Sequence, residues 1–372
     1  MLSYGNTPAS LRARFPNGIL GTTPQQRVAT TRQTLKTEIW SISLQDGKRT
    51  LLFSDEDMGL EIRPIVGGHT VDSTRNVAYV DGVERTWEAP PKLATPGVYE
   101  TSKGVYEVSL DGSKHFQRLF NATQNMSAAM LNAAGTRAAF YGWEDKGGYF
   151  LYVYELPSGK LLTRANTVRI FQTHCGSCLP QQAGWLAGGK ELFFVLQEGD
   201  DDDSADEAQS GGPGTCLLSE QGTDLGAMPA HAGEMNLPDY KREPSTAPYL
   251  IAQMEDGSYL FLDSGLKKGP LPKASIHFDG FLVLAGPDFK VQKQIRLGSL
   301  RASEFQLSRD GTWLAYVENR ELPTYTTERH FWVRNLQTGE EKEILIVPTA
   351  NPPNSPEPKA SVVLLGWIGE TK

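Results

Sequence analysis

The sequence predicts an all-β protein: a six-bladed β-propeller of four-stranded antiparallel blades, whose ring is closed by a C-terminal strand joining the N-terminal blade. Three observations predict it. A strand-turn-strand sequence motif, called the phrase below, recurs along the chain. Its copies run from end to end without a linker, and turn-forming residues are abundant. The composition agrees, because 37 Gly, 23 Pro and 39% hydrophobic residues are typical of many short strands joined by many turns.

The clearest copy of the phrase lies at residues 306–317 and continues at residues 330–339. Asp310 and Gly311 predict a two-residue hairpin turn, because Gly tolerates the positive φ that such turns need and β-forming residues flank the pair. Residues 313–317 and 331–334 have strand patterns, and Gly339 closes the next turn before residues 343–347. Four short antiparallel strands in one meander make a propeller blade.

Five weaker copies precede the clear one. They pair residues 27–30 with 39–43, 76–80 with 105–109, 135–141 with 150–154, 189–195 with 215–218, and 257–262 with 280–284. Together the copies give about six units spaced by roughly 50 to 70 residues, slightly above the usual blade period. Seven blades is the alternative, if residues 226–250 contain a further weak copy.

The two ends of the chain predict how the ring closes. The N-terminal copy lacks an innermost strand, because residues 5–26 are rich in Gly, Pro and Thr, whereas residues 361–367 form an apolar strand with no partner. Pairing that strand with the N-terminal blade removes both open sheet edges. We expect one domain over residues 1–372, with an irregular N-terminal extension at residues 1–14 and a disordered acidic loop at residues 198–214.

Charge and hydropathy exclude some partners. The formal net charge is −8 and no basic run occurs, which disfavours nucleic acid and anionic membranes. No apolar stretch of about 18 residues predicts membrane insertion, and the N-terminus lacks the charged and apolar regions of a secretory signal. We therefore expect either a cytoplasmic protein or a periplasmic or extracellular one whose signal peptide was removed.

The phrase at residues 308–317, together with residues 332–339, resembles the repeat of TolB-like propellers, which also occurs in the propeller domains of prolyl-oligopeptidase-type peptidases. The resemblance extends to the copies that contain Val77 and Ala138. It implies a six-bladed propeller that acts as a non-catalytic binding module for a protein or peptide outside the cytoplasm, and we expect a monomer. A peptidase is disfavoured because no Gly-x-Ser-x-Gly nucleophile elbow occurs.

Ligands are expected at one mouth of the central channel, where the loops that enter the innermost strands meet the loops that join second and third strands. The candidate ligand-binding residues are Glu61, Arg63, His69, His174 and His231. Ionisable groups held together in a dry cleft can perform acid-base catalysis, but polar residues also line most water-filled channels. The catalytic residues therefore stay unassigned.

The cysteines allow two interpretations. His174, Cys175 and Cys178, with His231, offer the ligands of a Zn or Cu site, and a metal-dependent lyase or hydrolase at the channel mouth is the alternative function. A single Cys-x-x-Cys is a weak zinc signal, so no cofactor is favoured. The other interpretation is a structural disulfide among Cys175, Cys178 and Cys216, or unreactive thiols. Redox chemistry is disfavoured, because the sequence lacks the βαβ pattern of a thioredoxin-like site.

Two kinds of loop are further candidates for binding sites. Residues 198–207 are rich in carboxylates but lack the position pattern of a calcium loop, which favours a solvated loop. Residues 81–103 and 319–329 carry Trp87 and Tyr325, which are candidate anchors for a protein partner. A scaffold without any ligand is the third functional interpretation.

Overall fold

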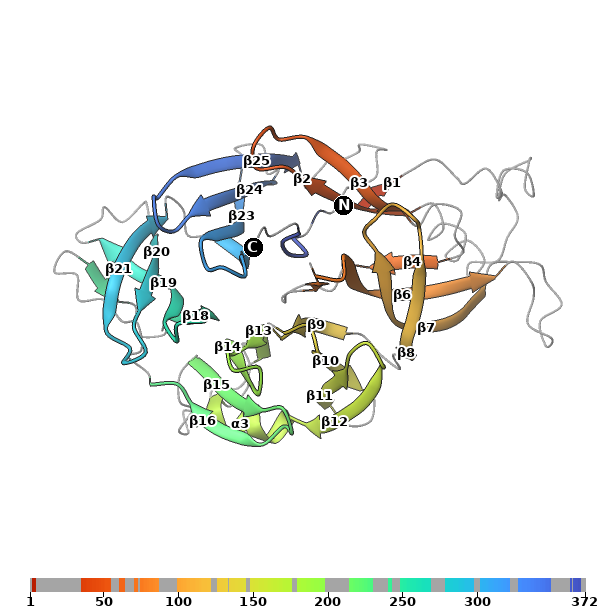
Figure 1. Ribbon diagram of the computed structural model, residues 1–372. Helices are drawn as coiled ribbons and strands as arrows, with labels where there is room; N and C mark the ends of the chain where they lie inside the picture. The colour runs from red at the N-terminus through yellow and green to blue at the C-terminus, as the bar shows by residue number, and fades with distance from the viewer. Residues whose placement is uncertain are drawn as a thin grey trace.

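The computed structural model of the protein describes residues 2–4, 35–54, 60–63, 70–72, 74–86, 99–121, 126–132, 134–144, 148–175, 179–197, 214–229, 240–242, 248–268, 278–297, 302–321, 327–348, 362 and 364–368. These residues form antiparallel sheets that stand around a central axis and follow one another round the ring in chain order (Figure 1). The prediction of an all-β propeller is confirmed. No helix in this described part has the length and hydropathy needed to cross a membrane.

Five sheets have four or five strands and are numbered here as blades 1 to 5. Blade 1 contains β4 (Leu60–Arg63), β5 (Val71–Asp72), β6 (Val77–Thr86), β7 (Tyr99–Ser109) and β8 (Phe116–Asn121). Blade 2 contains β9 (Met126–Leu131), β10 (Arg137–Glu144), β11 (Gly148–Glu155) and β12 (Lys160–Asn166). Helix α3 (Val168–Cys175) then leads to blade 3, which contains β13 (Leu179–Trp185), β14 (Glu191–Gln197), β15 (Gly214–Ser219) and β16 (Asp224–Ala227).

Blade 4 contains β17 (Tyr240–Arg242), β18 (Tyr249–Gln253), β19 (Tyr259–Lys268), β20 (Phe278–Ala285) and β21 (Val291–Leu297). Blade 5 contains β22 (Ala302–Leu307), β23 (Trp313–Glu321), β24 (Thr327–Asn335) and β25 (Glu341–Pro348). A three-stranded N-terminal sheet contains β1 (Leu2–Tyr4), β2 (Leu35–Ile42) and β3 (Arg49–Ser54). Figure 1 shows β9, β13 and β18 near the centre and β12, β16 and β21 on the outside.

Apolar side chains fill the space between neighbouring blades. In β14, Leu192 and Phe194 pack with residues of blade 2, whereas Phe193 and Val195 pack with residues of blade 4. This division follows from the pleat, because successive side chains of a strand point to opposite faces of the sheet. The β14 sequence reads as a continuous apolar run because both faces are buried.

A β-bulge recurs in the outermost strand of all six sheets. In each one, the register to the preceding strand skips a single residue. The skipped residues are Leu52, Leu119, Leu162, Leu225, Gln292 and Ile344. A bulge interrupts the hydrogen-bond ladder and increases the local twist, so it protects an exposed edge strand from pairing with another chain.

The hairpin turn at Asp310 and Gly311 is longer than the sequence indicated. Ser308 N donates to Trp313 O at 2.8 Å, so residues 309–312 form a four-residue connection rather than a two-residue turn. The Asp310 carboxylate accepts the Thr312 amide at 3.0 Å and the Ser308 hydroxyl at 2.6 Å, and Gly311 adopts a φ of +68°. The prediction was wrong because it assigned no role to the Ser308 and Asp310 side chains, which stabilise the longer turn.

The C-terminal segment, defined here as Val362 and residues 364–368, lies between the innermost strands of blades 5 and 1. Trp367 Nε1 donates to Gln306 O at 2.8 Å, and Leu365 O accepts from Thr70 N at 3.1 Å. An equivalent hydrogen bond joins blades 3 and 2, where Trp185 Nε1 donates to Met130 O at 3.1 Å. The segment therefore occupies the position of an innermost strand.

The apolar side chains of this segment divide as those of a blade strand do. Val362 and Leu364 pack with residues of blade 5, whereas Leu365 and Ile368 pack with residues of blade 1 and the N-terminal sheet. The segment is nevertheless not a regular strand in its described residues, which differs from the strand expected at residues 361–367. Its described hydrogen bonds go to Thr70, to Glu304 and Gln306 of β22 and to Arg329 of β24, and not to a continuous ladder with one partner.

Two further expectations concern the chain's irregular parts. Residues 2–4, assigned from the sequence to an irregular extension, form β1 and pair with β2. Three residues are too few for a strand pattern to be recognised in the sequence. Residues 2–4 are a strand because they pair with β2. Of the expected acidic loop at residues 198–214, only Gly214 lies within the described residues, where it begins β15.

The indole hydrogen bond of Trp367 gives a test of whether the C-terminal segment stabilises the fold. We expect Trp367→Phe to lower the free energy of unfolding by about 1–3 kcal/mol, because the Gln306 carbonyl loses its indole donor. Trp313→Phe is the matched control, since its indole donates no hydrogen bond within the part of the chain that the structure describes, and it is expected to change stability by clearly less than Trp367→Phe. Urea unfolding of both variants measures the difference, and equal stabilities would contradict a structural role for the segment.

Candidate functional site

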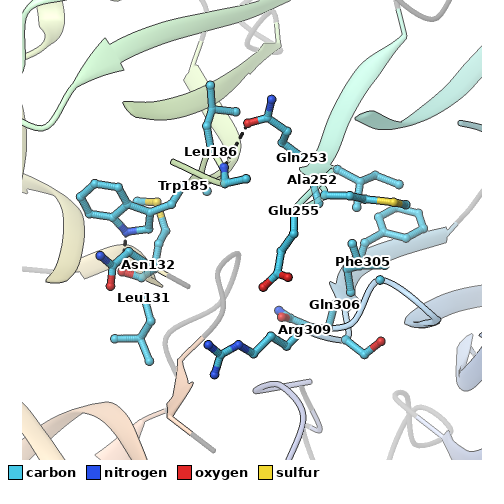
Figure 2. A pocket seen from close by; sticks show the side chains of 18 of the residues that line it. Leu131, Asn132, Trp185, Leu186, Ala252, Gln253, Glu255, Phe305, Gln306 and Arg309 are labelled. Carbon is cyan, nitrogen blue, oxygen red and sulfur yellow. Dashed lines mark hydrogen bonds between the residues drawn. The ribbon is translucent and has the colours of Figure 1, made fainter. Parts of the chain in front are cut away.

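A cavity of about 200 Å³ lies where the innermost strands end. Its walls come from the C-terminal halves of β9, β13, β18 and β22, from β5, and from the turns that follow these strands. Figure 2 shows side chains of four blades gathered around this hollow. Residues far apart in the chain meet here because every blade contributes the same end of its innermost strand.

This cavity and the expected ligand site lie at different ends of the innermost strands, and the expectation about ligands stays a prediction. The sequence interpretation placed ligands where the loops enter the innermost strands, at the N-terminal ends of these strands. The described lining residues lie instead at their C-terminal ends and in the turns to the second strands. These turns are short and hydrogen-bonded, so they hold side chains at fixed places on the rim.

Four neighbouring blades have equivalent turns at the cavity; in blade 2, Gly135 N donates to Asn132 O at 2.9 Å, and blades 3 to 5 repeat this hydrogen bond. Glycine amides donate to the carbonyls three residues earlier, as Gly189 N to Leu186 O at 2.8 Å, Gly257 N to Met254 O at 3.0 Å and Gly311 N to Ser308 O at 2.9 Å. The residue that follows each accepting carbonyl therefore has the same place in its turn. These residues are Ala187 in blade 3, Glu255 in blade 4 and Arg309 in blade 5.

Most polar side chains of the wall are used to hold blades and turns together. Gln253 Oε1 accepts the amide of Ala187 at 3.0 Å, and Gln182 Nε2 donates to Ile251 O at 3.4 Å, so both amides join blade 3 to blade 4. Asn132 Oδ1 accepts the amides of Thr136 and Arg137 within its own turn. These groups shape the cavity and are not directed at a ligand.

Asp72 also has a structural role. Its Oδ1 accepts the amides of Thr74 at 3.0 Å and Arg75 at 3.1 Å, and the residue is buried. Gly135 of the next blade approaches the same carboxylate, since a Cβ added to Gly135 would stand 3.0 Å from Asp72 Oδ2. A side chain at this position would have to displace the carboxylate, so glycine is required for the close approach of the two turns.

Glu255 and Arg309 are the exposed charged residues among the described lining residues. Figure 2 shows both side chains extending into the hollow from adjacent blades. The turns that carry them are held by the next residue in each case. A hydrogen bond from Ser258 lowers the pKa of Asp256, and one from Ser308 lowers the pKa of Asp310, so both carboxylates stay ionised and keep accepting turn amides.

None of the candidate ligand-binding residues is among the described residues that line this cavity. Glu61 and Arg63 lie on β4, opposite Val83 and Asp81 of β6, and neither is among the described residues that line the cavity. Their side chains lie outside the described part of the structure, as do His69 and His231. Their proposed roles stay predictions.

His174 lies on the periphery of the ring and not at the channel mouth. It is in the last turn of α3, and its Nε2 stands 2.9 Å from Asp224 Oδ1 on β16, the outermost strand of blade 3. Burial opposes ionisation of Asp224, but the hydrogen bond from His174 and the Gly226 amide leave the pKa of this carboxyl below its usual value. His174 therefore fastens the helix to the outer strand.

Local sequence explains why a helix stands at this point. The Asn166 side chain accepts the Val168 amide at 3.0 Å as an N-cap. One turn later Phe171 is buried against the rings of Tyr141 and Phe194, at centroid distances of 5.7 and 5.3 Å. The sequence pattern does not indicate this helix, because it has only eight residues and its position depends on that tertiary packing.

Of the three cysteines, Cys216 has a described side chain. Cys216 is a free thiol with 1% exposure, so it forms no disulfide with Cys178. The side chains of Cys175 and Cys178 lie outside the described part, and a disulfide between those two stays a prediction. No group of three His, Cys, Asp or Glu suited to a metal occurs among the residues that the structure describes.

Sequence reasoning missed Glu255 and Arg309. Both stand two residues before a glycine in a turn that the repeat pattern had identified, so the signal was the register of the repeat rather than a motif. The interpretation treated those turns as connections only. Aligning the turns on their glycines would have placed the two charges side by side on neighbouring blades.

Comparisons with known proteins give structural similarity only. No protein-family model matches the chain, and no curated protein matches it. TolB from Acinetobacter baumannii is similar in structure over 87% of this chain and 60% of its own, with 11% identity and a TM-score of 0.47. The putative TolB from Agrobacterium tumefaciens is similar over 84% of this chain and 89% of its own, with 10% identity and a TM-score of 0.45.

A puromycin-hydrolyzing peptidase from Mycobacterium tuberculosis is similar over 83% of this chain and 44% of its own, with 12% identity and a TM-score of 0.43. TolB proteins, whose repeat the sequence resembles, and peptidases therefore both occur among the similar structures. This chain spans less than two thirds of the length of the first TolB protein and of the peptidase. The propeller assignment rests on the sheets of this chain.

The buried thiol gives a test that separates Cys216 from the other two cysteines. Burial, with a smaller contribution from the Asp224 charge, raises the pKa of the Cys216 thiol to about 12. We expect no labelling of Cys216 by iodoacetamide at pH 8 in the native protein and full labelling in urea, because the thiolate is the reactive form. Peptide mass spectrometry identifies the labelled cysteine, and rapid native labelling of Cys216 would contradict its burial.

The same thiol has a pH signature. Its pKa is higher in the folded than in the unfolded chain, so its contribution to stability is complete below about pH 9 and is lost progressively as pH rises toward 12. Cys216→Ala removes this contribution, so its stability is expected to fall less steeply than that of the wild type over this range. Urea unfolding at pH 8 and pH 10.5 compares the two slopes.

Proposed function

We propose that the protein is a non-catalytic binding module that takes a segment of a protein or peptide partner at the C-terminal ends of its innermost strands. The observation that carries the proposal is the cavity rim, where Glu255 and Arg309 stand at equivalent turn positions beside an apolar wall. A concave, partly apolar site with a few convergent polar groups is the usual form of a binding site.

The size of the cavity supports side-chain recognition. Its volume of about 200 Å³ is below the roughly 300–1,000 Å³ typical of pockets that enclose a whole small molecule. One or two side chains of a bound segment fit such a space, and the remainder of the segment would lie across the rim. Recognition of this kind concentrates binding energy in a few anchor residues.

The chemistry of the lining favours binding over catalysis. The described lining residues include no histidine or cysteine, and the Ser308 hydroxyl already donates to Asp310 and accepts the Trp313 amide. Nucleophilic catalysis needs a hydroxyl or thiol beside a base. The alternative of a metal-dependent lyase or hydrolase rests on residues outside this cavity, and no observation favours it.

The ring that presents this site is, in our proposal, six-bladed. The six recurring outer-strand bulges support six units, and the C-terminal segment fills the innermost position beside the N-terminal sheet. Joining the two ends of the chain in one blade leaves no gap in the ring. The resemblance to TolB-like repeats supports a periplasmic or extracellular location, and we expect the module to be a monomer.

Blocking the cavity tests the proposed binding site. Heptapeptides selected from a random-sequence library on the wild-type protein serve as probes, with affinities measured by isothermal titration calorimetry. Ala187→Trp is expected to weaken binding at least tenfold, because the indole would occupy the mouth. The turn should accept the indole, since Glu255 and Arg309 carry long side chains at the equivalent position.

Ala227→Trp is the matched control, placed on the outermost strand β16 at an exposed position, and it is expected to leave the affinity unchanged. Equal affinities for the two variants would place peptide binding elsewhere. Failure to select any peptide that binds would count against the binding module itself.

A further inference from the structure

We infer that the partner segment carries one acidic and one basic side chain close together, which meet Arg309 and Glu255 respectively. This inference rests on the proposed function and adds the chemistry of the ligand. It comes from the arrangement of charges on the rim. The described lining residues that carry charge are Asp72, which is buried, and Glu255 and Arg309, which are exposed.

Asp72 is excluded as a ligand group by its surroundings. The carboxylate is buried, caps the turn of blade 1 through two backbone amides, and has Gly135 packed against its second oxygen. The rim therefore presents one exposed acid and one exposed base. A ligand with a single sign of charge would be attracted by one of them and repelled by the other.

The two charges are held at matched places. Glu255 and Arg309 each occupy the first position of the turn that follows the innermost strand, in neighbouring blades. The next residue, Asp256 or Asp310, accepts a backbone amide at the end of the same turn. The backbones are therefore fixed while the side chains remain exposed. Fixed backbones set the spacing of the charges, and flexible side chains let them adjust to a ligand.

Neither side chain has to be unpaired for this recognition. Exposed ion pairs contribute little to stability, so a ligand that offers a carboxylate and an ammonium exchanges partners at little cost. Arg presents a planar fork suited to a carboxylate, whereas a Glu carboxylate accepts the donors of a Lys ammonium. On the other side of Glu255, the equivalent position is Ala187, which leaves room for a ligand side chain.

Three blocked pentapeptides test the charge preference without contributions from chain termini. They are acetyl-Gly-Lys-Leu-Asp-Gly-amide, acetyl-Gly-Lys-Leu-Lys-Gly-amide and acetyl-Gly-Asp-Leu-Asp-Gly-amide, measured by calorimetry at about 50 mM salt, where screening is weak. The wild type is expected to bind the mixed peptide at least fivefold more tightly than either single-sign peptide. Glu255→Arg should shift the preference to the acidic peptide, and Arg309→Glu to the basic one.

The exchange variant Glu255→Arg with Arg309→Glu decides the matter, because it keeps the net charge and is expected to restore the preference for the mixed peptide. Glu340→Arg and Lys160→Glu are the matched controls, since both residues are exposed, neither lines the cavity, and each makes the same charge change. They should preserve the wild-type order of affinities.

The outcomes separate the inference from the proposed function. If the peptides bind with affinities that ignore their charge in all variants, the charge inference is wrong and the binding site stands. If no blocked peptide binds while library peptides do, the ligand chemistry is again wrong. If library peptides also fail to bind, the proposed function fails.

Discussion

The structure depends on the burial of both faces of blades 1 to 5. A strand such as β14 sends Leu192 and Phe194 to one side and Phe193 and Val195 to the other, so no blade can satisfy its apolar surface alone. Each sheet therefore needs a neighbour on both sides, and an open row of blades would leave two apolar faces in water. Closing the ring is the arrangement that removes both of those faces.

The closing contact uses the same physical device as an ordinary blade contact. Trp185 and Trp367 each donate an indole hydrogen bond to a carbonyl of the preceding inner strand, Met130 and Gln306 respectively. Val362 and Leu364 face one neighbour, and Leu365 and Ile368 face the other. The C-terminal segment thus supplies an apolar surface on both sides, although its described residues have no regular ladder.

The candidate site is a consequence of that closure. A ring brings the same end of every innermost strand to one place, and short capped turns fix whatever residue each blade has there. Variation of one turn position among blades, as in Ala187, Glu255 and Arg309, changes the chemistry of the rim without changing the fold. The inner Gln residues illustrate the opposite role, because Gln182 and Gln253 join neighbouring blades.

The sequence by itself determined the architecture, because strand alternation, turn glycines and the repeat are local properties that can be counted along the chain. It indicated that residues 361–367 close the ring, since an apolar segment without a partner needs one. The tertiary structure decided which end of the channel carries the cavity, that His174 lies on the periphery against Asp224, and that Cys216 is a buried free thiol. These outcomes depend on side chains from different blades meeting in space, and no spacing within a single repeat specifies which of them meet.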